Sequence, residues 1–250
     1  MMLRSLAQAP QFSEENLVAA LDEFRERILN EWLAPFCENR GYENGEFVWS
    51  SLDKLNETDA RDFIDAVDSG LVSHKAGVFR AACSRANEYL FWEGAASVSP
   101  RRLTLWLEPV ITIAGLRRMQ HKFGWPAEQL GAQSASYAFD FVGYQADQRT
   151  ELVSCEAKPT RKAVDLLIAR MHKHAATPKE GLKGCSSAEV NALKKVIALR
   201  ESSSHTFWAL GPDGYGHVFD VSRSPTGEVV LTQTNDSALN FESGCADGES

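Results

Sequence analysis

Several signals that define other classes of protein are missing from this 250-residue chain. No apolar run approaches the roughly 18 to 20 residues that cross a bilayer. Residues 1–10 contain no basic segment followed by a long apolar one. We therefore expect neither a membrane anchor nor a secretory signal. The motifs G-x-x-x-x-G-K-[S/T], G-x-G-x-x-G and G-x-S-x-G are also missing, which argues against P-loop, dinucleotide-binding and serine-hydrolase sites.

Cysteine is scarce and gives no metal-binding pattern. The chain has an odd number of widely spread cysteines, namely Cys37, Cys83, Cys155, Cys185 and Cys245. Without a C-x-x-C pair, a zinc ribbon is disfavoured. Free thiols in a reducing compartment are the simpler interpretation, so we expect a cytoplasmic protein. The length suffices for one large domain, or for a core with a smaller attached lobe.

The net charge of −8 argues at first against a nucleic-acid partner, but the charge is unevenly distributed. Residues 1–100 carry 9 Lys and Arg against 17 Asp and Glu, residues 101–200 carry 16 against 9, and residues 201–250 carry 1 against 8. A basic middle between acidic ends suits a phosphate-binding core. The alternative is that these cations only solvate helix faces, and charge alone does not separate the two interpretations.

Residues 1–98 are predicted to form an acidic, helical N-terminal lobe. Apolar residues recur there at helical spacing, and Ser13 is a candidate N-cap for the first helix. The expected helices cover residues 17–32, 58–67 and 75–92. The negative charge of the lobe makes it a candidate surface for a protein partner or for homodimerisation.

Residues 99–242 are predicted to form an α/β core, followed by a flexible tail at 243–250. Ser99 and Pro100 open a helix that Pro109 must kink or restart. Aromatic and β-branched runs predict strands, and apolar residues at helical spacing predict further helices. The expected strands cover residues 137–144, 151–158, 206–210, 216–221 and 228–232, and the expected helices cover 162–174 and 187–200. The first two strands read as a hairpin.

Charged residues stand at unusual places in this predicted hairpin. Asp140 lies within an apolar strand, and Glu156 and Lys158 lie at the end of the next one. Because side chains alternate along a strand, Ser154, Glu156 and Lys158 face one side while the small apolar residues between them face the other. A charged side chain in such a place costs several kcal/mol of folding free energy unless it is paired or binds a metal. If the two strands are neighbours, the carboxylates of Asp140 and Glu156 can meet at a single point.

Two carboxylates with open positions suit Mg²⁺, a hard cation that keeps several waters and accepts phosphate oxygens. A lysine beside them can orient an attacking water, help to deprotonate it, or counter developing charge. Asp140, Glu156 and Lys158 are therefore the candidate catalytic residues, and Asp140 and Glu156 the candidate metal ligands.

The order Asp140, then Glu156-Ala-Lys158 after the intervening residues 141–155, resembles the signature of the PD-(D/E)xK nuclease superfamily. Position 139 is Phe where the family often has proline. The resemblance implies a restriction-endonuclease-like α/β core, in which a mixed central sheet has helices on both faces. It also implies hydrolysis of phosphodiester bonds in DNA with Mg²⁺ (or Mn²⁺), in processes such as restriction, phage defence or repair.

The same resemblance suggests further site residues. An additional acid on the helix before the Asp strand matches Glu108 as a third metal ligand, with Glu93 as the fallback. A cation on the helix after E-x-K that meets phosphate matches Lys162, Arg170 or Lys173.

Other interpretations stay open. A lone strand Asp is more often a bulge or edge feature, and E-x-K alone is common on solvated strands. A chain with this fold and an inactive site would act as a nucleic-acid-binding or protein-binding regulatory module. The sequence does not separate DNA from RNA as the substrate.

Overall fold

The computed structural model describes residues 14–42, 46–94, 102–178 and 184–241. Its centre is a six-stranded sheet with the order β11-β10-β9-β8-β7-β6. The strands are β6 (Leu130–Ala132), β7 (Phe141–Tyr144), β8 (Glu151–Ala157), β9 (Thr206–Leu210), β10 (Gly216–Arg223) and β11 (Val229–Thr234). Only β8 and β9 pair in parallel, and every other neighbouring pair is antiparallel. The sheet is therefore mixed, as predicted.

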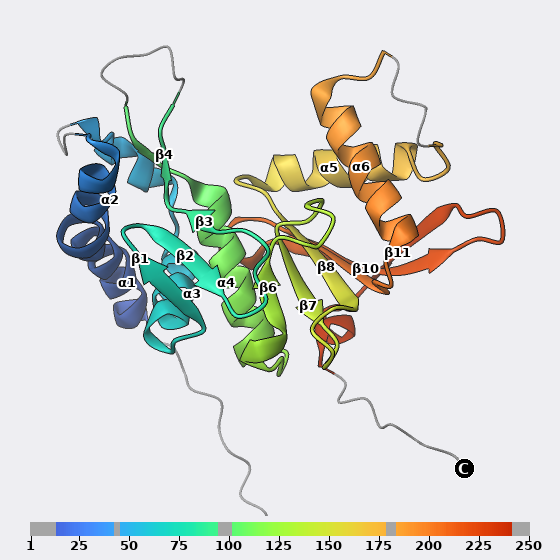
Figure 1. The fold of residues 1–250 in the computed structure, drawn as a ribbon, viewed down its shortest axis with the longest axis horizontal. Coiled ribbons are helices and arrows are strands. Elements are labelled where there is room, and N and C mark those ends of the chain that lie inside the picture. The colour runs from blue at the N-terminus through green and yellow to red at the C-terminus, as the bar shows by residue number, and fades with distance from the viewer. Residues whose placement is uncertain (1–13, 43–45, 95–101, 179–183, 242–250) are drawn as a thin grey trace, which may run out of the picture.

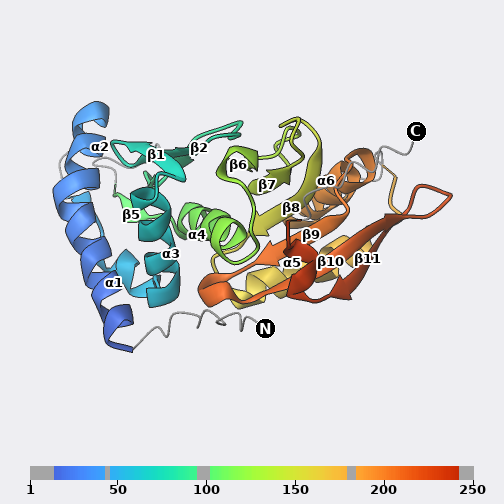
Figure 2. The same ribbon diagram turned by 90° about the horizontal axis from the view of Figure 1, so that it is seen from below.

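Helices cover both faces of this sheet (Figures 1 and 2). On one face lies α4 (Leu107–His121), and on the other lie α5 (Arg161–Lys173) and α6 (Ser187–Glu201). The side chains on the two faces of the sheet belong to two separate apolar clusters. Val153, Cys155 and Ala157 belong to the cluster on the α4 side, whereas Val142 and Ala209 belong to the α5 and α6 side. The alternation expected for strand 151–158 is thereby confirmed.

The N-terminal region begins with three consecutive helical segments, α1 (Glu14–Arg27), a π-helical turn (Ile28–Trp32) and α2 (Leu33–Arg40). It continues with a 3₁₀ turn (Trp49–Lys54), α3 (Glu57–Asp68), and the short strands β1 (Val72–Lys75), β2 (Val78–Ala81), β3 (Glu88–Tyr89), β4 (Phe91–Trp92) and β5 (Thr104–Leu105). β1, β2 and β3 form one small sheet, and β4 and β5 form another. Further 3₁₀ turns span Ala127–Gln129, Pro212–Gly214 (η5) and Asp236–Leu239.

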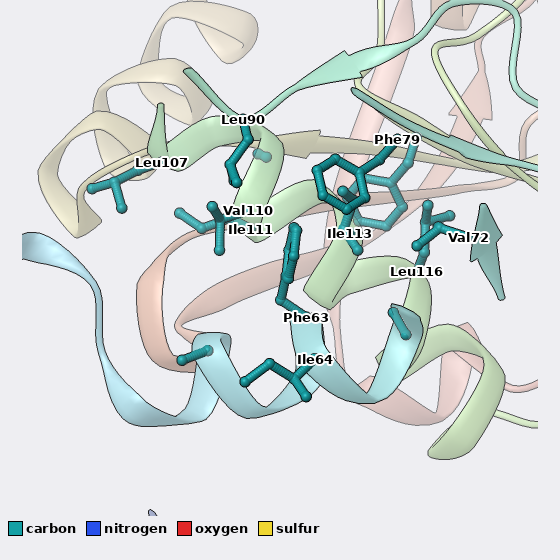
Figure 3. Packing of buried hydrophobic residues seen from close by; sticks show 14 of the residues in the cluster. Phe63, Ile64, Val72, Phe79, Leu90, Leu107, Val110, Ile111, Ile113 and Leu116 are labelled. Atoms are coloured by element: carbon teal, nitrogen blue, oxygen red, sulfur yellow. The ribbon is translucent and has the colours of Figure 1, made fainter. Parts of the chain in front are cut away.

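The α4 helix joins the N-terminal region to the central sheet. Buried Phe63 and Ile64 of α3, together with Val72 and Phe79, pack against α4 residues such as Ile113 (Figure 3). On its other side α4 lies close to the sheet at Gly115, where an added Cβ would come within 2.5 Å of the Phe141 ring. One continuous apolar cluster therefore runs from the N-terminal helices through α4 to the sheet.

A buried ionic network fixes the C-terminal half of α4. Arg118 donates to Asp59 of α3 and to Asp62, each at 2.6 Å. Asp59 is only 1% exposed, and it also accepts the backbone N–H of Asp213 in η5 at 2.9 Å. Asp213 has a φ of 60°, and the bond to Asp59 helps to hold this conformation. The network thus connects α3, α4 and the turn after β9.

The predicted helix over residues 75–92 is wrong. Ala76 and Gly77 have φ values of 53° and 70°, and they form a two-residue turn between β1 and β2, because Lys75 pairs with Val78. Both positive φ values match the type I′ turn that fits the twist of a hairpin. The aromatic residues of this segment therefore lie on short strands, and the N-terminal region is not wholly helical.

Two other boundaries differ from expectation. The helix expected from Ser99 begins at Leu107, so Pro109 lies in its first turn, where its missing N–H is tolerated. The strand expected over 137–144 begins only at Phe141, because Tyr137 has a φ of 55° in a turn. The short strand β6 was not predicted, and the candidate N-cap Ser13 and the tail at 243–250 lie outside the described residues.

The remaining core elements agree with the sequence to within about two residues. Side-chain caps explain where the two later helices begin: Thr160 accepts the backbone N–H of Ala163, and Ser186 forms a capping box with Glu189. Within the described part of the chain, no helix combines the length and the apolar character needed to cross a membrane.

Candidate metal and nucleic-acid site

Asp140, Glu156 and Lys158 come together at one end of the β7–β8 pair. Asp140 immediately precedes β7, and its backbone N–H donates to Cys155 of β8 at 3.0 Å, so the antiparallel pairing continues through it. Glu156 is near the end of β8, and Lys158 follows the strand. This is the end of β8 from which the chain leads into α5 (Figure 1).

The Asp140 carboxylate is held against β8. Its Oδ2 atom accepts the backbone N–H of Ala157 at 2.8 Å. Burial raises the pKa of Asp140 well above its usual value, and the charge of Glu156 adds to this, while Lys158, Lys195 and the Ala157 N–H act in the opposite direction. The site therefore places two carboxylates close enough to repel each other.

Glu156 is 3% exposed and lies between two lysines. Its Oε1 atom accepts a hydrogen bond from Lys158 Nζ at 2.6 Å. Its Oε2 atom lies 2.7 Å from Nζ of Lys195, which α6 provides. That second contact is an ion pair without hydrogen-bond geometry, and among the described residues Oε2 accepts no hydrogen bond. One buried carboxylate oxygen thus has electrostatic compensation only.

The Lys158 ammonium lies among acceptors from two elements. Besides Glu156, it contacts the Ala157 carbonyl at 2.8 Å and Oε1 of Glu108 at 3.3 Å. Burial lowers the pKa of Lys158, but the carboxylates of Glu156, Asp140 and Glu108 outweigh that effect, so its pKa lies above the usual value. Lys158 is consequently a cation in this arrangement. It can orient a water or stabilise negative charge, but it does not begin as a neutral base.

Glu108 reaches the site from the first turn of α4, as the resemblance implied, but it contacts the lysine. The described residues contain no group of three or more His, Cys, Asp or Glu side chains arranged to hold a metal ion. The role of Glu108 as a third metal ligand stays a prediction. Glu93, the fallback, lies instead beside Arg40 and Tyr42 in the N-terminal region.

The three cations expected to meet phosphate are spread along α5. Lys162 is exposed in the first turn, four residues after Lys158 in the chain. Arg170 is half-buried, and Lys173 donates to Glu189 of α6 at 2.6 Å. At about 1.5 Å of rise per residue, Lys173 lies roughly 16 Å along the helix from Lys162. Lys162 is therefore the best placed of the three for a phosphate at the site.

Lys195 was missed because its importance depends on tertiary structure. It belongs to a Lys-Lys pair on α6, and nothing in the sequence indicates which of the two turns inward. In the structure its side chain is 12% exposed, Nζ donates to the Ala138 carbonyl at 2.5 Å, and Nζ lies 5.5 Å from the centre of the Phe139 ring. Lys195 therefore links α6 to β8 and to the segment that precedes β7.

Glu88 of β3 is a second missed residue. It is 7% exposed and accepts a hydrogen bond from Gln133 Nε2 at 3.2 Å. Gln133 has a φ of 61°, and its backbone N–H donates to the Asp140 carbonyl at 2.7 Å. Burial raises the pKa of Glu88 to about 7, the bond from Gln133 opposes the shift, and the charge of Glu108 adds to it. The N-terminal region thus places a buried acid next to the site.

Replacing Glu88 by Gln is expected to stabilise the protein above pH 7. The folded-state pKa of about 7 exceeds the usual glutamate pKa of 4.5, so ionisation destabilises the folded state as pH rises between these values. At pH 8 the variant should be more stable by up to about 3 kcal/mol, and the difference should vanish near pH 4.5. The Gln carbonyl can still accept the bond from Gln133. Urea unfolding across this pH range, with exposed Glu38→Gln as the control, measures the effect. A pH-independent difference would contradict the assignment.

The donor set of the site fits a hard divalent cation. Asp140 and Glu156 supply carboxylate oxygens, and the buried Oε2 atom of Glu156 accepts no hydrogen bond from the described residues. Two protein carboxylates, with the remaining positions left to water and phosphate oxygens, are typical of Mg²⁺ sites in proteins that act on phosphates. No protein-family model, curated protein or solved structure matches this chain. The function is therefore inferred from the residues of the chain and from their geometry.

Proposed function

We propose that this protein is a metal-dependent nuclease that hydrolyses phosphodiester bonds in DNA. The observation that carries the proposal is the convergence of Asp140, just before β7, and Glu156 of the neighbouring β8, with the Lys158 ammonium 2.6 Å from Glu156. The sequence order of these residues and the mixed sheet with helices on both faces support it. The restriction-endonuclease-like character of the core is part of the same proposal.

The residues divide the chemistry among them. Asp140 and Glu156 would hold Mg²⁺ or Mn²⁺, which when bound supplies a Lewis acid and lowers the pKa of a coordinated water. Lys158 is held by Glu156 and Glu108, so its charge would lie close to a phosphate bound to a metal on Glu156. A fixed cation stabilises the charge that develops on the phosphate without reorganising. Lys162, exposed at the start of α5, would neutralise a neighbouring phosphate.

The test is cleavage of supercoiled and linear DNA. We expect wild type to nick and linearise supercoiled DNA with Mg²⁺ or Mn²⁺, and to stop when a chelator is added. Lys158→Met should lower the cleavage rate by about 10²-fold, because a charged group that acts in the transition state is lost. Lys122→Met, at the opposite end of α4 and 60% exposed, is the control.

Two results would argue against an active nuclease. If neither DNA nor RNA is cut with either metal, the catalytic proposal fails. Metal-independent binding of DNA without cleavage would instead favour the regulatory binding module, in which the same fold serves recognition. Cleavage of RNA but not DNA would keep the site and change the substrate.

A further inference from the structure

Glu156 is compensated twice within the protein itself. Lys158 satisfies Oε1 with a hydrogen bond, and Lys195 lies 2.7 Å from Oε2. The two lysines come from different elements, the end of β8 and the middle of α6. Glu156 and Lys195 are 4% and 12% exposed in their side chains, so solvent screens their interaction only weakly. A buried carboxylate this far from water needs such a counter-ion for the fold to be stable.

The two contacts of Lys195 differ in kind. Toward Ala138 the ammonium donates a hydrogen bond to the carbonyl oxygen at 2.5 Å. Toward Glu156 it supplies charge without hydrogen-bond geometry. The Oε2 atom therefore keeps its capacity to accept a ligand, and the ammonium beside it would repel any second cation that approaches. Lys195 thus stabilises Glu156 when no metal is bound and opposes metal binding at the same oxygen.

We propose that the Lys195 ammonium and a divalent cation compete for the Glu156 carboxylate, so that Lys195 sets the metal affinity of the site. This inference rests on the proposed metal site. Lys195 acts through Glu156 and is a positioning residue. Its loss has two opposite consequences: the metal-free protein loses the counter-ion of a buried charge, while the metal meets less repulsion. Without Lys195 the Glu156 carboxylate also regains rotational freedom, which metal binding must then remove. We expect the relief of repulsion between the two cations to outweigh this entropic cost.

The experiment measures Mn²⁺ binding by calorimetry and thermal unfolding with and without Mn²⁺, both without nucleic acid. Lys195→Met keeps an unbranched side chain of similar length and removes the charge. We expect it to bind Mn²⁺ at least about tenfold more tightly than wild type. Its metal-free Tm should be lower than that of wild type, and its Tm should rise more on addition of Mn²⁺. If Lys195 only tethered α6, its replacement by Met would lower the Tm without tightening Mn²⁺ binding.

Three further variants make the test specific. Lys195→Gln can still donate to the Ala138 carbonyl, so it should also bind Mn²⁺ more tightly and serves if Lys195→Met does not fold. Lys195→Arg keeps the charge and should restore affinity close to that of wild type. Lys194→Met, the exposed neighbour on the same helix, should match wild type in both Tm and affinity.

The outcomes separate this inference from the function on which it rests. If wild type binds Mn²⁺ and the neutral Lys195 variants bind it equally or more weakly, the competition is overturned while the metal site stands. If wild type binds no Mn²⁺, the metal site itself fails and the competition with it. Tighter binding by the neutral variants, reversed in Lys195→Arg, supports both.

Discussion

Asp140→Asn is expected to lower the rate of DNA cleavage by about 10³-fold and at the same time to raise the Tm of the metal-free protein. The loss of activity follows because Asp140 is one of the two proposed metal ligands, and Asn carries no charge with which to hold a cation. The gain in stability follows because the half-buried Asp140 carboxylate is desolvated and is repelled by Glu156. Catalysis and stability should therefore change in opposite directions.

The geometry makes this substitution a clean one. Asn has nearly the shape of Asp, and its side-chain oxygen can still accept the Ala157 N–H that Asp140 Oδ2 accepts at 2.8 Å. Cleavage of supercoiled DNA with Mg²⁺ measures the first effect, and thermal unfolding in a chelator measures the second. Asp147→Asn, in the turn between β7 and β8, is the control for activity.

The paired result discriminates between explanations. Loss of activity together with a lower Tm would indicate a folding defect and leave the role of Asp140 unsupported. Activity equal to that of wild type would remove Asp140 from the site. A higher Tm together with loss of activity in Asp140→Asn would indicate that the Asp140 charge destabilises the fold but is needed for function.

Arg118→Met is expected to produce the largest loss of stability, about 3 to 5 kcal/mol. Asp59 is 1% exposed and Arg118 is the cation that compensates it, through Nη2 at 2.6 Å. Methionine fills the space of the aliphatic stem but leaves Asp59 and Asp62 without that charge. Breaking a buried ion pair by removing one partner leaves an uncompensated charge, and the size of the penalty reflects this.

Urea unfolding monitored by tryptophan fluorescence measures this loss. Arg117→Met is the matched control, since Arg117 is the neighbouring residue on α4 and donates to Gln120 at 2.9 Å in a part-buried contact. That variant should lose less than about 1 kcal/mol. An Arg118→Met protein within 1 kcal/mol of wild type would show that Asn56 and the Asp213 N–H suffice to stabilise Asp59.

The parts of the fold that could be predicted from sequence are those that short-range chemistry determines. The β8 strand was recognisable from alternation, α5 and α6 from apolar residues at helical spacing, and β9 to β11 from the glycine and proline turns between them. The N-terminal strands were missed because each has only two to four residues, too few to show a period. The available signal was Gly77, because glycine readily adopts the positive φ that such a turn requires.

The candidate site divides along the same line. The convergence of Asp140 with Glu156 followed from strand alternation and an antiparallel neighbour. Lys195 and Glu88 could not be found in this way, because their positions depend on how α6 and β3 dock onto the sheet. The contact between Glu108 and Lys158, rather than a group of three carboxylates, likewise depends on where α4 begins.

The network around Arg118 also constrains when the protein can fold. The Asp213 N–H and the Asp59 carboxylate that accepts it are 154 positions apart in the chain. Contacts of such long range form late, because the intervening chain must first be ordered, and chains rich in them fold slowly. During synthesis the Asp59 carboxylate therefore lacks the Asp213 N–H until a much later part of the chain has been made. The N-terminal region cannot complete its folding ahead of the central sheet. The two halves of the sequence are in this sense a single unit of folding.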